Sequence, residues 1–329
     1  MIVEHQNLNQ DMFSPNVEYA PIRKGFGEGL VQLGREDDNV VALCADLTES
    51  TQMHLFRDEF PDRFVEVGIA EQNLVTVASG MAAAGKIPFV SSYAAFSPGR
   101  NWEQIRTTIA LNNQPVIIAG SHAGLSVGPD GATHQMLEDI ALMRSLPNMT
   151  VLVPADIHEA HRAVVAAAQL RKPVYIRLAR EKTAIITTPD TPFEIGRAQV
   201  YREGEDVTIL ACGPLVHEAM LAAKQLESVG VSTEVVNVAT IKPLDKKTIL
   251  ESTKKTGAVV TVEEGQITGG LGGAVCELLS EHYPLPVERV GVRDLFGQSG
   301  IVSELWAAYG IDAEHIAQAA RRVIERKAL

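Results

Sequence analysis

Short apolar runs alternate with longer helical patterns along most of the chain. Five runs rich in β-branched residues lie at residues 40–46, 88–93, 114–120, 149–155 and 173–179. The helical patterns between them lie at residues 20–34, 70–84, 100–112, 134–145 and 156–170. Near-continuous apolar strands separated by helices are typical of a parallel sheet covered on both faces. We therefore predict an α/β fold for this half of the chain.

The alternation starts again after residues 187–196, which include two prolines, a glycine and three threonines. Further strands are expected at residues 207–213, 232–238, 258–264 and 287–292, again with helices between them. We predict two α/β domains, each a mostly parallel sheet with helices on both faces. The expected division is an N-terminal extension (1–19), a first domain (20–190) and a second domain (191–329).

Composition narrows the class of protein. A length of 329 residues suits two domains, and 46% hydrophobic residues supply a sizeable core. With 29 basic against 41 acidic residues, the net charge of −12 argues against a nucleic-acid or membrane partner. The three cysteines are far apart, which argues against disulfides and structural zinc. The first residues resemble no signal peptide, and no apolar run could span a bilayer, so we expect a cytoplasmic protein.

Candidate catalytic and binding residues follow the expected strands. In parallel α/β sheets, ligands bind at the carboxyl ends of the strands. Asp46 ends one run, His122 and Arg180 follow two others, and Tyr93 and Phe96 lie after a fourth. The two aromatic residues suit either a core or a stacking wall for a flat ring.

Glu71 stands at the head of a run of small and apolar residues, in the stretch "EVGIAEQNLVTVASGMAAAG". An acid in the first turn of a helix is favoured by the partial positive charge there. The alternative is a buried catalytic acid, because a carboxyl in an apolar pocket favours its protonated form. The residues alone leave both interpretations open.

Three other segments also allow two interpretations each. The stretch "HAGLSVGPDGATHQ" (122–135) combines glycines with two histidines and an aspartate, and suits a polar substrate pocket or a purely structural loop. The glycine-rich stretch "GGLGGAV" (269–275) suits a phosphate-binding turn or, more often, a tight turn before a helix. His158 and His161 could face one metal ion from a helix, but no third ligand is close in sequence.

Taken together, the segments resemble the C-terminal portion of transketolase, namely its pyrimidine-binding domain followed by the transketolase C-terminal domain. The resemblance runs from about residue 20 to the end of the chain. In "GIAEQN", Glu71 matches the glutamate that contacts the aminopyrimidine of thiamine diphosphate. Phe96 matches the aromatic residue that stacks on the pyrimidine, and Tyr93 matches its neighbour. Asp46 and Arg100, which also follow strands, are assigned to the cofactor site as well.

The resemblance also implies a site for a phosphorylated sugar. "GPDGATHQ" is similar to a transketolase signature, which assigns Asp130 and His134 to sugar hydroxyls, with His134 also in a catalytic role. Four further positions match the residues that hold the sugar phosphate: Arg23, Ser50, His122 and Arg180.

The resemblance further implies a partner. Thiamine-diphosphate enzymes of this type bind the diphosphate and Mg²⁺ through a separate domain with a G-D-G…N motif, and no G-D-G occurs in this sequence. The chain therefore resembles one subunit of a split transketolase, whose N-terminal partner carries the metal and diphosphate ligands. The family implies a heterotetramer of two chains of each kind.

The implied activity is the transfer of a two-carbon ketol unit from a ketose phosphate to an aldose phosphate. Glu71 would share a proton with a ring nitrogen of the cofactor, and Phe96 would hold the ring by stacking. Gln72 and Asn73 resemble 1-deoxyxylulose-5-phosphate synthase instead, which gives one alternative. A second alternative is the β subunit of a 2-oxoacid dehydrogenase E1, although that enzyme would not need the four phosphate-binding residues. A third is a transketolase for a sulfo- or branched sugar, and a fourth is a catalytically silent regulatory subunit.

Overall fold

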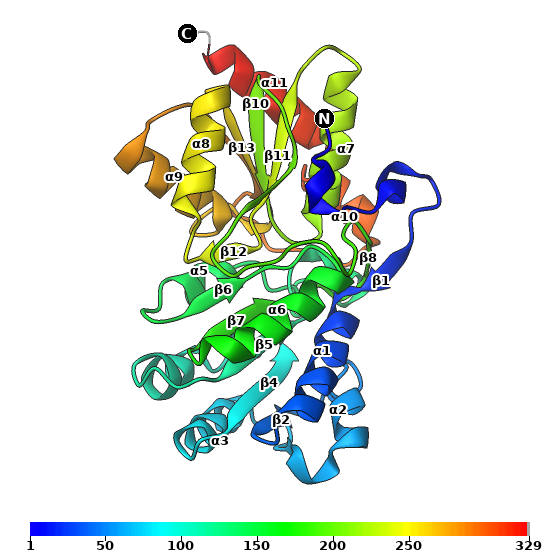
Figure 1. Cartoon of the computed structure of the whole chain (residues 1–329). Helices are drawn as coiled ribbons and strands as arrows, with labels where there is room; N and C mark the ends of the chain where they lie inside the picture. Colours follow the sequence, from blue (N-terminus) through cyan, green and yellow to red (C-terminus); the bar gives the residue numbers. More distant parts are fainter. Residues whose placement is uncertain (328–329) are drawn as a thin grey trace.

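The computed structural model describes residues 1–327, which form two α/β parts stacked one above the other (Figure 1). The first contains a seven-stranded sheet in the order β12-β6-β7-β5-β4-β2-β3, in which all strands except β12 run parallel. Its strands are β2 (Val40–Cys44), β3 (Phe64–Glu66), β4 (Ile87–Tyr93), β5 (Ile117–Ser121), β6 (Thr150–Leu152), β7 (Val174–Arg177) and β12 (Thr240–Lys242).

Helices cover both faces of this sheet. Alternate residues of each strand point to opposite faces, so Ala42 joins one apolar cluster and Leu43 the other. On the first face lie α1 (Ile22–Glu36), α2 (His54–Glu59) and α6 (Ile157–Leu170). On the second face lie α3 (Glu71–Ala83), the π-helical η4 (Ile105–Ala110) and α5 (Asp139–Arg144).

The second part contains a five-stranded sheet in the order β14-β13-β10-β11-β9, in which only β9 is antiparallel. Its strands are β9 (Gln199–Arg202), β10 (Val207–Ala211), β11 (Thr233–Asn237), β13 (Val259–Gln266) and β14 (Val287–Val292). Its helices are α7 (Leu215–Glu227), α8 (Lys246–Thr256), α9 (Leu271–His282), α10 (Val302–Ala308) and α11 (Ala313–Lys327). The fold class predicted from the sequence is thereby confirmed.

Two segments cross between the parts. β12 follows a strand of the second sheet but pairs with β6 at the edge of the first. Conversely, the N-terminal segment packs against the second part, where Met12 is buried in the core and its carbonyl oxygen lies 2.9 Å from His217 Nε2. The N-terminus therefore lies beside α7 in Figure 1. The chain returns to the first part through β1 (Tyr19–Pro21), which pairs with β8 (Lys182–Ala184).

Two predicted helices differ from the structure. The pattern at 134–145 predicted one helix, but only α5 is helical there, because residues 131–138 form turns that begin at Gly131 with φ +73°. The pattern at 100–112 is divided into α4 (Trp102–Gln104) and η4. Short elements such as α2 and β3 were not predicted, since they carry little periodic signal.

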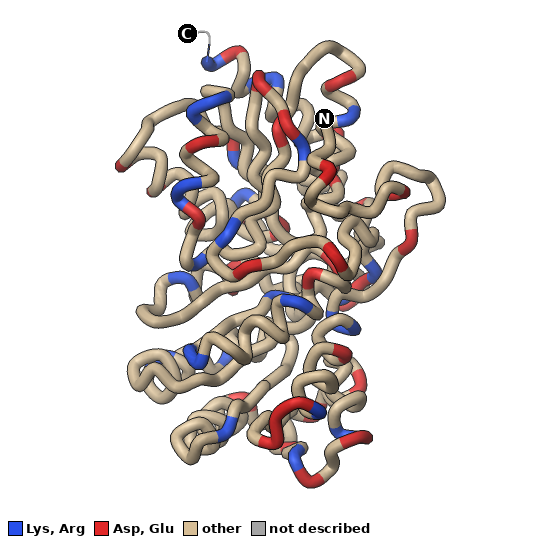
Figure 2. The backbone as a smooth tube through the Cα atoms, viewed as in Figure 1, with Lys and Arg blue, Asp and Glu red and all other residues tan. Residues whose placement is uncertain are grey.

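Charged side chains are spread over both parts. Figure 2 shows basic and acidic positions interspersed along the backbone, consistent with a net charge of −12 that is distributed over the chain. Among residues 1–327, no helix is long and apolar enough to cross a membrane.

Candidate functional site

Glu71 is the first residue of α3, and its side chain is buried with only 4% exposure. Leu74 and Val75, one turn further along the same helix, are buried in the apolar cluster on this face of the sheet. Within residues 1–327, the Glu71 carboxyl has no hydrogen-bond partner and no ion-pair partner, whereas its backbone oxygen accepts a hydrogen bond of 2.8 Å from Asn101 Nδ2. The carboxyl oxygens are therefore free to accept hydrogen bonds from a donor outside this chain.

The turn after β4 lies against the start of α3. Asn101, itself fully buried, donates to the Glu71 backbone and lies 3.1 Å from Ser97 Oγ, and so joins the helix to this turn. The turn carries Phe96, which is half-buried and lies parallel to the ring of Tyr93, the last residue of β4, at 5.9 Å and 18°. Sequence reasoning missed Asn101, although an amide directly after a Pro-Gly turn is a usable signal.

His122 extends this aromatic group. It follows β5 directly, adopts a positive φ of 54° and stacks on Tyr93 with ring centroids 3.8 Å apart. His134 lies edge-on to both neighbours, 6.1 Å from Tyr93 and 5.6 Å from Phe96. Four of the residues predicted for the site thus form one continuous cluster at the carboxyl end of the first sheet.

Two guanidinium groups lie close to this cluster. Arg23, in the first turn of α1, donates a hydrogen bond to the backbone oxygen of Arg180, and its buried Nε has no partner among the described residues. Arg180 Nη1 donates to Val127 O at 2.7 Å and lies 3.9 Å from Asp130 Oδ1. Burial and the adjacent Arg180 charge lower the pKa of Arg23. Two neighbouring cations with a free buried donor suit an anion such as a phosphate.

His122 is neutral in this environment. Its side chain is 2% exposed, and its Nδ1 lies 2.9 Å from Ser121 Oγ. Burial, followed by the charges of Arg23 and Arg180, lowers the pKa of His122 to about 3. The neutral imidazole can therefore donate a hydrogen bond from one nitrogen and accept one at the other, but it adds no positive charge beside Arg23 and Arg180.

Three predicted residues remain outside this cluster. Ser50 lies in the turn after β2, and no hydrogen bond or ion pair joins it to Arg23, His122 or Arg180 in the part of the chain described. Arg100 is exposed, and the described residues give its side chain no hydrogen-bond partner. Asp46 is exposed and adopts a φ of 57°.

The backbone around Asp46 is fixed by Glu66, which sequence reasoning also missed. Glu66 Oε1 accepts hydrogen bonds from the backbone N–H groups of Asp46 at 2.7 Å and Gly68 at 2.9 Å. Its Oε2 accepts a hydrogen bond of 2.9 Å from Thr48 Oγ1. Glu66 thereby joins the loop after β2 to the segment that leads into α3.

The glycine-rich turn before α9 is occupied by the chain itself. Glu263 accepts hydrogen bonds of 2.8 Å from the backbone N–H groups of Leu271 and Gly272, at the first positions of the helix. Burial raises the pKa of Glu263 to about 7. Because these amides already bind a carboxyl group, the turn is a capped helix start and not a phosphate site.

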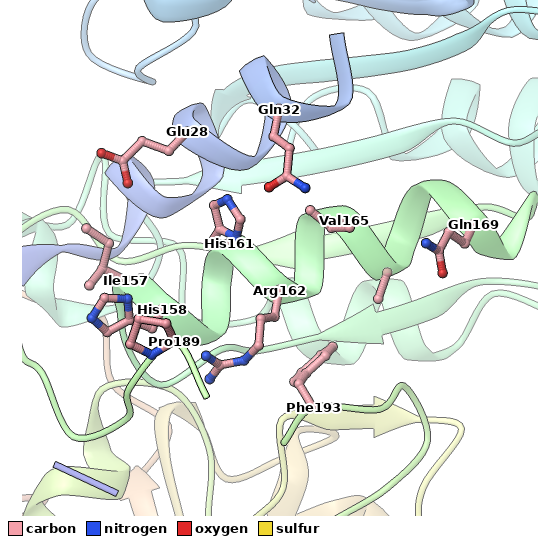
Figure 3. A pocket seen from close by; sticks show the side chains of 11 residues that line it. Glu28, Gln32, Ile157, His158, His161, Arg162, Val165, Gln169, Pro189 and Phe193 are labelled. Atoms are coloured by element: carbon pink, nitrogen blue, oxygen red, sulfur yellow. The ribbon is translucent and has the colours of Figure 1, made fainter. Parts of the chain in front are cut away.

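The histidine pair on α6 lies elsewhere. His158, His161 and Arg162 line a cavity of about 570 Å³ between α1, α6 and the segment of Pro189 and Phe193 (Figure 3). Among residues 1–327, no group of three or more metal-binding side chains is found. The Arg162 guanidinium donates hydrogen bonds to the Thr188 carbonyl and to Thr187 Oγ1, so it belongs to the wall of this cavity.

Two domain families match the chain and divide it between them. The transketolase pyrimidine-binding domain matches residues 18–185, and the transketolase C-terminal domain matches residues 196–316. The chain belongs to the transketolase family. These matches confirm the resemblance inferred from the motifs, and the pyrimidine-binding domain implies a thiamine-diphosphate enzyme.

Two similar proteins and one solved structure match this chain over nearly their whole length. A provisionally named transketolase C-terminal section of Methanocaldococcus jannaschii is 45% identical over 93% of this chain and 96% of that protein. The 6-deoxy-6-sulfo-D-fructose transketolase subunit of Clostridium sp. (strain MSTE9) is 41% identical over 97% of this chain and 99% of that subunit. A solved structure described as a split-gene transketolase, inactive β4 tetramer, has a TM-score of 0.88 and 46% identity, covering 93% of this chain and 99% of its own.

Proposed function

We propose that this chain is the C-terminal subunit of a two-chain transketolase, which moves a two-carbon ketol unit from a ketose phosphate to an aldose phosphate. An N-terminal partner subunit would supply the ligands of Mg²⁺ and of the cofactor diphosphate. The similar transketolase C-terminal section and the split-gene structure, described as an inactive β4 tetramer, support this division of the enzyme. A tetramer of two chains of each kind remains part of the proposal.

One observation carries the proposal: the buried Glu71 carboxyl has no hydrogen-bond partner in residues 1–327, next to the turn that presents Phe96. A carboxyl group in this setting fits a protonated nitrogen of an aminopyrimidine, which would supply the missing donor. The face of the half-buried Phe96 fits the flat ring itself. The residues present therefore suit the pyrimidine end of thiamine diphosphate.

Bound thiamine diphosphate supplies the electron sink needed to break the carbon–carbon bond beside a ketose carbonyl. Glu71 would hold a proton between its carboxyl and the pyrimidine ring nitrogen, and Phe96 with Tyr93 would orient that ring. Asp46 and Arg100 are proposed for the cofactor site on the sequence alone.

The same chain would hold the sugar. Arg23 and Arg180 would bind the phosphate through charge-assisted hydrogen bonds, and the neutral His122 would add one further hydrogen bond. Asp130 and His134 would bind the sugar hydroxyls, and Ser50 is proposed for the phosphate from the motif match.

A second substrate has a specific observation in its favour. The Clostridium relative, named for 6-deoxy-6-sulfo-D-fructose, matches nearly the whole chain. A sulfonate and a phosphate are both tetrahedral oxyanions, so the group of Arg23, His122 and Arg180 would suit either one. A sulfosugar is therefore the second candidate donor.

The experiment is a donor comparison in the reconstituted complex. The chain is mixed with its N-terminal partner, thiamine diphosphate and Mg²⁺, and product formation is measured with fructose 6-phosphate, 6-deoxy-6-sulfofructose or pyruvate as donor. We expect ketol transfer from one of the two ketoses and little reaction with pyruvate. Reaction with pyruvate alone would contradict the proposal and favour a deoxyxylulose-phosphate synthase or a 2-oxoacid dehydrogenase. Reaction with none of the three would favour a regulatory subunit.

A further inference from the structure

The loop of residues 122–135 is held from the second part of the molecule. It carries His122, proposed above for the phosphate of the substrate, and Asp130 and His134, proposed for its sugar hydroxyls. Its helical segment η5 (Leu125–Asp130) packs against α10, which lies at the junction of the two sheets (Figure 1). The residues that hold this loop can therefore act on the site from the C-terminal domain.

The main connection is Glu264, near the end of β13, whose side chain is 1% exposed. Its Oε1 accepts hydrogen bonds from the Ser126 backbone N–H at 2.5 Å and from Trp306 Nε1–H at 3.0 Å. Its Oε2 accepts a hydrogen bond of 3.1 Å from Ser126 Oγ. One carboxyl group thus joins the loop, β13 and α10.

The fit around Glu264 is close. A Cβ atom on Gly124, which has a φ of +83°, would lie 2.6 Å from Glu264 Oε2. Only glycine brings the loop backbone this near to the carboxyl group without strain. A second connection runs from Gln135 Nε2 to the Gln298 carbonyl at 3.0 Å, so both ends of the loop are joined to the C-terminal domain.

The residue after Ser126 contacts one of the proposed phosphate-binding arginines. Val127, the neighbour of Ser126, accepts the hydrogen bond from Arg180 through its carbonyl. Behind the loop tip lies a cavity of about 540 Å³, lined by Pro129, Gly300 and Trp306. Leu125 packs into the apolar core of the second part, and the hydrogen bonds to Ser126 add a directional contact one residue further along the loop.

We propose that Glu264 is a positioning residue through which the C-terminal domain fixes the substrate loop, and thereby Arg180 and Asp130. This inference rests on the function proposed above. Arg177 supports the arrangement, since its Nη2 donates to the Glu264 carbonyl at 2.7 Å while its Nε pairs with Asp139 at 2.9 Å. Burial raises the pKa of Glu264, and the charge of Arg177 together with the three donors opposes that shift.

The test compares Glu264→Leu with Glu263→Leu in the complex with the N-terminal partner. The two acids are neighbours in β13 with 1% exposure each, but Glu263 binds the start of α9 and not the loop. We expect Glu264→Leu to raise KM for the sugar phosphate donor by about tenfold or more, with kcat changed less. Glu263→Leu should leave KM within about twofold of wild type, whatever its effect on Tm. Glu264→Gln, which keeps an oxygen acceptor, should raise KM less than Glu264→Leu does.

A second measurement is independent of activity. In the ¹H–¹⁵N spectrum, the indole N–H of Trp306 should move in Glu264→Leu, while that of Trp102, which donates to the Leu142 carbonyl at 3.0 Å, should not. If Glu264→Leu does not fold, Trp306→Phe removes one donor and should raise KM by about threefold. An unchanged KM in the variant that folds, or an equal rise in Glu263→Leu, would overturn the positioning role. If the wild-type complex itself shows no ketol transfer, the proposed function fails instead, and the indole shift still tests the contact.

Discussion

At the residue scale, Glu71 is the most unusual group of the site. An exposed acid in the first turn of a helix gains from the helix dipole by a few tenths of a kcal/mol to about 1 kcal/mol. Glu71 occupies that position, but it is buried, and the described residues offer its carboxyl no donor. A helix-start acid gains nothing from burial, so a structural role alone does not explain why Glu71 lies inside the fold.

We predict that Glu71→Ala leaves the fold intact and lowers kcat of the reconstituted complex by on the order of 10²-fold, because positioned proton transfer is lost. The matched control is Glu314→Ala, which removes an exposed acid from the first turn of α11. It should leave kcat unchanged. A folded Glu71→Ala complex with near-normal kcat would refute the role of Glu71.

The protonation of His122 gives a second prediction at this scale. Because the folded pKa is lowered to about 3, the ring should stay neutral from pH 8 to pH 5, where an exposed histidine becomes charged. NMR titration of ring-labelled protein should show a flat His122 signal over this range, assigned by comparison with His122→Asn. A midpoint near pH 6.5 for His122 would contradict the described environment.

At the element scale, the sequence was most informative for strands that helices cover on both faces of the sheet. Strands such as β2 and β4 were predicted because their apolar runs are nearly continuous. The stretch 134–145 was mispredicted because tertiary hydrogen bonds replace helical ones there. The Met136 carbonyl accepts from the Gly124 N–H and the Leu137 carbonyl from the Gln266 N–H, each at 2.8 Å, and these distant partners leave no local pattern.

The start of α9 provides a prediction about stability. Burial raises the pKa of Glu263 to about 7, from 4.5 for a free glutamate. Between pH 7 and pH 5, the folded chain therefore holds a proton that the unfolded chain has lost, so this group adds stability as the pH falls. Its contribution is at most about 1.4 kcal/mol per pH unit.

We expect Glu263→Gln to reduce the gain in unfolding free energy between pH 7 and pH 5, measured by urea denaturation. Glu159, whose pKa burial also raises to about 7, remains in both proteins, so the difference between them isolates Glu263. Equal pH slopes for wild type and Glu263→Gln would contradict the assignment.

At the scale of the whole molecule, sequence reasoning predicted that several residues of the candidate site would be neighbours, but it did not predict the residues that hold them in place. Parallel topology brings strand ends together, which is why Tyr93, His122 and Arg180 could be predicted as neighbours. Asn101, Glu66 and Glu264 escaped prediction, because a buried polar residue looks ordinary until its distant partner is known. The last of these ties the two parts of the chain together at the proposed substrate loop.

We propose that two chains each supply part of one active site, and mixing the two chains tests this most directly. With thiamine diphosphate, Mg²⁺ and a ketose phosphate present, the N-terminal partner is added in steps to a fixed amount of this chain, and ketol transfer is measured. We predict no transfer by either chain alone and a rise that reaches its plateau at an equimolar ratio. Full activity of this chain without the partner would contradict the account.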